Sequence, residues 1–194
     1  RAAAVARRLI STGATSQIAN MVLMADGIKR ENFDAVLADI EAGQSVGPLI
    51  DGLLKAWTQL GAGKMSDAVA TFDVVAETKG IEIFGLYHKA LALGMAGDYE
   101  GAGAILSGET AGPLQLTRRG ILAYVQVLSQ LDRNPDAIDL IDATFPGGLD
   151  PAMEQLRADL EAGKPIPFDA IRNTKDGAAE VYLVVAGALN GEAA

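Results

Sequence analysis

The sequence predicts an all-α protein, and three observations support this fold class. Apolar residues recur at three- and four-residue steps, for example at Ile18, Val22 and Ala25, which is the spacing of one helix face. Hydrophobic residues make up 49% of the chain but aromatic residues only 5%, a balance that favours closely packed helices over sheets. Gly and Pro residues divide the chain into segments of about ten to eighteen residues, a usual length for globular helices.

The breaks between the expected helices define the elements in chain order. Clusters of glycine, proline and asparagine mark them at 43–47, 61–63, 80, 97, 108–113, 134–135, 146–148 and 163–167. Helix start signals accompany several breaks, at Ser45, Ser66, Asp98 and Asp150, the last followed by Pro151. We therefore expect antiparallel helix pairs at 45–77 and 82–106, and further helices at 150–162 and 176–190.

Similar residues recur at a fixed spacing in the middle of the chain. Four pairs are separated by 34 positions, namely Ala56 and Ala90, Gly63 and Gly97, Ala68 and Ala102, and Phe72 and Leu106. Related segments lie at 131–141 and at 30–40. Because a period of this length is typical of helical repeat proteins, the sequence predicts repeated helix-turn-helix units.

These residues resemble the tetratricopeptide repeat, a 34-residue helix-turn-helix unit with small residues at facing helix positions and a Gly at the turn. The segment 97–102, Gly-Asp-Tyr-Glu-Gly-Ala, matches the turn closely. The resemblance covers about residues 17–145 and implies a right-handed superhelix of antiparallel helix pairs. Two features depart from the family pattern: Trp57 lies five positions after the usual Trp, and no Pro ends the unit after Phe72 or Leu106. Another class of α-solenoid therefore remains an alternative.

The repeat pattern divides the chain into two expected regions. Residues 1–145 are expected to form a TPR-like array of about three to four helix pairs, the first truncated. Residues 146–194 are expected to form an irregular C-terminal helix pair packed on the array. Apolar residues surround the last helix, at Val181, Tyr182, Leu183, Val184, Val185 and Leu189. We expect this helix to pair with a second copy or to fold back on 150–162, and the chain to be a fragment of a longer protein.

Composition argues against several classes of partner. The formal charge of −9 and the pI of about 4.6 disfavour binding to a phosphate backbone. The absence of cysteine excludes disulfides, thiolate metal ligands and cysteine nucleophiles. The strongest apolar run, 181–186, is much shorter than the roughly 20 residues that a bilayer span requires. We expect a soluble chain without a membrane span, and the composition leaves open a cytoplasmic or a periplasmic location.

No motif in the sequence indicates catalysis. The segment 61–66 lacks the first Gly and the Ser or Thr of a phosphate-binding loop. His88 is the only histidine, which excludes a two-histidine metal site, and no Gly-x-Ser-x-Gly motif provides a nucleophile. The carboxylates at Asp132, Asp136, Asp139 and Asp142 are interpreted as a solvated helix face. We therefore expect no catalytic residue, no metal and no cofactor.

The resemblance instead implies a concave groove lined by the first helix of each unit. The implied positions are Ile50, Leu53, Leu54 and Trp57, then Phe84, Tyr87, His88 and Leu91, then Arg119, Leu122, Ala123 and Gln126. The candidate partner-binding residues among them are Trp57, Tyr87, His88, Leu91, Arg119 and Gln126. Packing inside the core between repeats is the alternative role for these residues.

The sequence thus predicts an interaction scaffold that binds an extended peptide or a partner helix and performs no catalysis. The alternative is a groove that binds a small ligand or catalyses a reaction through Tyr87, His88 and nearby carboxylates. The sequence does not identify the partner protein.

Overall fold

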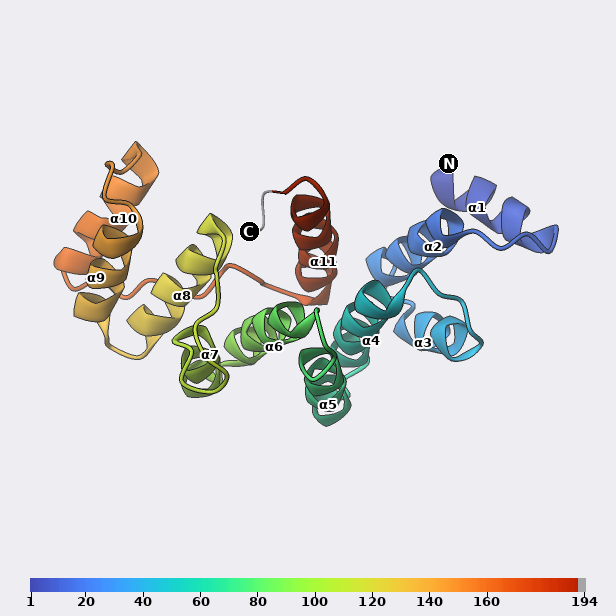
Figure 1. Cartoon of the computed structure of the whole chain (residues 1–194), viewed down its shortest axis with the longest axis horizontal. Coiled ribbons are helices and arrows are strands. Elements are labelled where there is room, and N and C mark those ends of the chain that lie inside the picture. The colour runs from blue at the N-terminus through green and yellow to red at the C-terminus, as the bar shows by residue number, and fades with distance from the viewer. Residues whose placement is uncertain (192–194) are drawn as a thin grey trace. The chain divides into compact units, whose positions relative to one another are not determined.

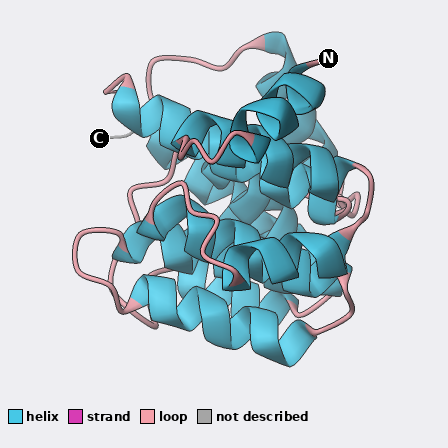
Figure 2. Ribbon diagram, turned by 90° about the vertical axis from the view of Figure 1, so that its right-hand side faces the viewer, coloured by secondary structure: helices cyan, strands magenta, loops and turns pink. Residues whose placement is uncertain are grey.

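The computed structural model describes residues 1–191, and these residues form eleven helices and no strand (Figures 1 and 2). The helices are α1 (Ala2–Ser11), α2 (Gln17–Lys29), α3 (Phe33–Glu41), α4 (Pro48–Gly61), α5 (Met65–Ala76), α6 (Glu82–Ala96), α7 (Tyr99–Leu106), α8 (Arg118–Gln130), α9 (Asn134–Thr144), α10 (Pro151–Glu161) and α11 (Thr174–Leu189). The all-helical prediction is confirmed for this part of the chain. Whether the helices form a superhelix of the tetratricopeptide type stays a prediction.

Six helix ends share one backbone geometry, and four of them are the turns α2–α3, α4–α5, α6–α7 and α8–α9. In these four turns a residue with positive φ lies one or two positions after the helix, at Glu31 (61°), Gly63 (75°), Gly97 (87°) and Asp132 (57°), and Gly43 and Gly163 have the same role after α3 and α10. After α4, the amide of Lys64 donates to the carbonyl of Gln59, and the amide of Gly63 donates to that of Leu60. Equivalent bonds occur at the other three turns. This is the Schellman helix end, in which a left-handed residue satisfies the last carbonyls of the helix.

The chain forms two compact units. The first contains Arg1–His88 together with the described residues from Asn173 onward, and the second contains Lys89–Arg172. The expected boundary at 145/146 falls inside the second unit. The two helices expected as one C-terminal pair are therefore assigned to different units, α10 to the second and α11 to the first.

Helices that are consecutive in sequence pack against each other in the first unit, from α1 to α5. The core lies between α4 and α5, where Leu53, Leu54, Ala56, Ala68 and Phe72 have no exposed surface. Ala56 and Ala68 are two of the small residues at the repeated positions, and alanines allow two helix axes to approach closely. Helix α11 then adds to this unit from far along the sequence, because it packs on α4 and α2 (Figure 1).

The second unit has its own core. Helix α8 packs against α7 and α9, and α9 packs against α10. The buried residues that meet there are Ile121, Val125, Leu128, Ala137, Ile141, Met153 and Leu160. Ala102, the small residue of the second repeated unit, is also fully buried.

No helix within residues 1–191 combines the length and the apolar character that crossing a bilayer would require.

Candidate functional site

The candidates Trp57, Tyr87 and His88 come together in the first unit, inside its core. Trp57 and His88 have no exposed surface and Tyr87 is 7% exposed. The indole Nε1–H of Trp57 donates a hydrogen bond to Nδ1 of His88 at 3.1 Å. The Trp57 ring also meets the ring of Phe72 edge to face, with 5.6 Å between centroids. The three side chains therefore form one packed cluster, which we call the Trp57 cluster.

Helix α11 covers the Trp57 cluster. A Cβ atom at Gly177 would lie 2.3 Å from Cε3 of Trp57, so only glycine fits against the indole. The hydroxyl of Tyr87 donates to Oε1 of Glu180 at 3.0 Å, and Glu180 is only 3% exposed. Glu180 is thus a buried carboxyl group in an otherwise largely apolar helix. Together, the Gly177 and Glu180 contacts hold α11 on the predicted groove positions.

His88 is held in its neutral form. Burial lowers its pKa to about 3, because a charged imidazole would lose its hydration. Since Nδ1 accepts from Trp57, the proton of the neutral ring is on Nε2, and this atom has no hydrogen-bond partner among the described residues. A buried imidazole without access to solvent does not fit the alternative in which His88 acts as a base in an open groove.

In the second unit, α8 holds an extended segment of the same chain. Oε1 of Gln126 accepts hydrogen bonds from the backbone amides of Asp169 and Ala170, at 3.1 and 3.0 Å. Nε2 of Gln130 donates to the carbonyl of Ile166 at 2.7 Å, and Oγ of Ser129 accepts from the amide of Ile166 at 2.8 Å. Three side chains on one face of α8 therefore bind main-chain groups of residues 166–170, which we call the docked segment.

The docked segment alternates in exposure. Ile166, Phe168 and Ala170 are half-buried, whereas the residues between them are exposed. Ile166 packs against the core of α8, α9 and α10. The ring of Phe168 occupies the space beside Gly94, where an added Cβ would lie 2.7 Å from Cζ, and it also meets the ring of Tyr99. The segment lies on the surface like an edge strand, with every second side chain directed inward.

The remaining candidates have different surroundings. Leu91 is 1% exposed and belongs to the core. Arg119 is exposed in the first turn of α8. Ser129, Gln130 and the docked segment itself were not predicted from the sequence. The signal that could have found the segment was the alternation of Pro165, Ile166, Pro167 and Phe168 within a region interpreted as a break.

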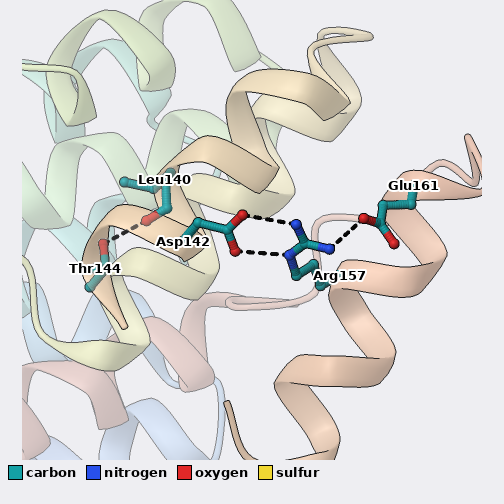
Figure 3. Close-up of polar contacts among 5 residues, drawn as sticks. All are labelled: Leu140, Asp142, Thr144, Arg157 and Glu161. Atoms are coloured by element: carbon teal, nitrogen blue, oxygen red, sulfur yellow. Dashed lines mark hydrogen bonds and ion pairs between the residues drawn. The ribbon is translucent and has the colours of Figure 1, made fainter. Parts of the chain in front are cut away.

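Two acidic residues of α9, Asp136 and Asp142, take part in surface ion pairs. Both carboxylate oxygens of Asp142 accept from Arg157 of α10 at 2.8 Å, and Arg157 also pairs with Glu161 (Figure 3). The hydrogen bond from Arg157 lowers the pKa of Asp142. Asp136 pairs with Arg133 at 2.6 Å. Within residues 1–191, no three His, Cys, Asp or Glu side chains are grouped as metal binding would require.

Comparison of the chain with protein-family models, with curated proteins and with solved structures gave no match. The likeness to tetratricopeptide repeats therefore rests on the residues and turns described above.

Proposed function

We propose that this chain is a protein-interaction module that binds an extended peptide segment of a partner along α8. The observation that supports this most directly is the pair of bonds from Oε1 of Gln126 to two successive backbone amides of the docked segment. Gln126 was also one of the positions that the family resemblance assigned to the partner-binding groove.

The bonds made by α8 suit a peptide of variable sequence. Gln126, Ser129 and Gln130 bind main-chain N–H and C=O groups, which every residue other than proline offers in the same pattern. Nε2 of Gln126 also donates a side-chain hydrogen bond to the carboxylate of Asp169. Main-chain bonds provide affinity, and pockets for alternate side chains provide specificity. Here the space beside Gly94 and Tyr99 accepts an aromatic ring. The proposed partner segment is therefore extended, with apolar side chains at alternate positions and an aromatic residue at one of them.

The docked segment competes with such a partner. A tethered segment has an effective concentration on the order of millimolar, so a weak free peptide does not displace it. Binding of a partner requires the docked segment to leave, and variants that loosen this segment are expected to bind more tightly.

The test uses the full chain and a fluorescein-labelled peptide with the sequence of residues 163–172. Phe168→Ala removes the aromatic anchor of the docked segment and leaves α8 intact. Fluorescence anisotropy is expected to show at least about tenfold tighter binding of the peptide to this variant than to the wild type. Pro167→Ala, which changes an exposed residue of the same segment, is the matched control and is expected to bind like the wild type.

A second variant decides where the peptide binds. Adding Gln126→Ala to Phe168→Ala removes two of the main-chain bonds, and the gain in affinity is expected to disappear. Equal binding by the wild type and by both variants would show that α8 is not a peptide site. Circular dichroism melts of each variant check that the fold is retained.

A further inference from the structure

A basic pocket lies between α1 and α2 in the first unit. Its volume is about 330 Å³, and its lining includes Arg1 and Arg7 along α1, and Lys29 and Arg30 at the end of α2. Asp26 is the one carboxylate in the lining, so four cations against one anion leave a formal surplus of three positive charges. The whole chain has a net charge of −9. The pocket is therefore opposite in sign to the rest of the molecule.

Asp26 fixes two of these cations in place. Its Oδ2 accepts from Nη2 of Arg7 at 2.6 Å, and its Oδ1 accepts from Nε of Arg30 at 3.1 Å. The hydrogen bond from Arg30 is the main cause of the lowered pKa of Asp26, so the carboxylate stays ionised. Each guanidinium has five N–H donors, more than one shared carboxylate can accept. The arrangement positions two guanidinium groups beside a second anion without neutralising both of them.

A larger pocket adjoins the basic one. Its volume is about 420 Å³, and it shares Arg7 and Asp26 with the basic pocket. Ile10, Leu23 and Val36 provide apolar walls, and Asp39 adds a second carboxylate, so the two pockets together have four cations and two anions and keep a positive surplus at the basic end. Together the two pockets accommodate a ligand that is longer than a single small anion and that has apolar groups beside its charge.

The larger pocket also contains a buried acceptor. Gln44 lines it, and Oε1 of Gln44 is buried with no hydrogen-bond partner among the residues that the structure describes. A buried carbonyl oxygen without a donor costs free energy, so a ligand that donates an N–H is favoured if the Gln44 side chain turns toward the pocket on binding. An acidic peptide combines a carboxylate, a backbone N–H and apolar side chains, whereas a free phosphate ion can donate through P–O–H but has no apolar group to pack against the walls of the larger pocket.

We propose that these two pockets form a binding site for an acidic peptide segment. A carboxylate of the peptide pairs with Arg7, Lys29 and Arg30, and a backbone N–H of the peptide donates to Gln44. The site shares no residue with α8 or with the docked segment, so a failure of the function proposed above leaves this site standing, and the reverse also holds.

The probe is the acetylated peptide Glu-Ala-Glu-Ala-Glu-Ala, titrated into the ¹⁵N-labelled full chain. Amide shifts are expected to change within residues 1–44, and the matching Gln-Ala peptide is expected to bind about tenfold more weakly. Lys29→Glu reverses one exposed charge of the pocket and is expected to weaken binding about tenfold. Lys79→Glu makes the same charge change at an exposed turn residue outside both pockets and is expected to have no effect.

Two further measurements distinguish the peptide from a free anion. Gln44→Leu is expected to weaken peptide binding several-fold, and inorganic phosphate at tenfold excess is expected to leave the peptide bound. Displacement by phosphate together with an unchanged affinity of Gln44→Leu would overturn the peptide as the occupant. Unchanged amide shifts in residues 1–44, or changes confined to α8 and the docked segment, would overturn the site itself. Circular dichroism melts of all variants exclude loss of the fold as the cause.

Discussion

In each unit, a segment from late in the sequence packs on a helix of that unit: α11 in the first unit and the docked segment in the second. The two segments are held by different chemical groups. In the first unit, α11 satisfies its own backbone bonds, so it contacts the Trp57 cluster through the side chain of Glu180 and through the close approach of Gly177 to the indole, not through main-chain hydrogen bonds. In the second unit, the docked segment is extended, and Gln126 and its neighbours bind its main chain directly. A helix must match the surface under it side chain by side chain, whereas an extended segment can be replaced by another of different sequence.

The largest expected difference is in the effect of removing an aromatic ring. Trp57→Ala deletes a fully buried indole and is expected to lower the free energy of unfolding by about 3–5 kcal/mol. Phe168→Ala deletes a half-buried ring and is expected to cost about 1–2 kcal/mol. Urea denaturation of both variants gives the two values. Equal losses would contradict the distinction between a core contact and a docked surface segment.

The fit of α11 on Trp57 is tested by a pair of glycines in the same helix. Gly177→Ala places a Cβ against the indole and is expected to destabilise the chain by about 1–3 kcal/mol. Gly187→Ala meets no atom within 4 Å, and is expected to stabilise by up to about 1 kcal/mol through helix propensity. Thermal melts compare the two. If Gly177→Ala were as stable as Gly187→Ala, α11 would not rest on the Trp57 cluster.

The Trp57 cluster also predicts a pH dependence. His88 has a pKa of about 3 in the folded chain and about 6.5 when unfolded, so the unfolded state binds the proton first. The full free energy of unfolding is therefore reached well above pH 6.5. It decreases as the pH falls towards 3, by roughly 1.5 kcal/mol between pH 6.5 and 5. Because His88 is the only histidine, His88→Gln is expected to remove this slope. Urea midpoints of the wild type and of His88→Gln, measured between pH 6.5 and 5, test this expectation. A flat wild-type profile would mean that His88 is solvated.

The helical elements could be predicted because their signals are local. The Schellman turns require a left-handed residue, which Gly63 and Gly97 provide at the repeated positions. In the other two of these four turns, Glu31 and Asp132 take the left-handed position. No glycine marks these turns in the sequence, so only the apolar spacing of the flanking helices predicted them. Regular spacing and turn chemistry therefore predicted the elements without any knowledge of tertiary contacts.

The long-range contacts could not be predicted in the same way. Nothing in the spacing of Tyr87 and Glu180 indicates that they meet across 93 positions of sequence. The groove positions were assigned from the family pattern, which does not contain a segment that covers them. Whether α11 also pairs with a second copy of the chain stays a prediction, since in the first unit it already packs on α4 and α2.

The smallest expected effect is local and is measured at the docked segment. Gln126→Ala removes acceptors for the amides of Asp169 and Ala170, and each such bond contributes about 1 kcal/mol. Because the segment lies on the surface, the loss is expected to appear as roughly fivefold faster hydrogen exchange at these two amides, with exchange in α9 unchanged. Gln155→Ala, at an exposed position of α10, is the control. Faster exchange throughout the second unit would mean that the docked segment is part of the cooperative core, and an exchangeable peptide site on α8 would then be excluded.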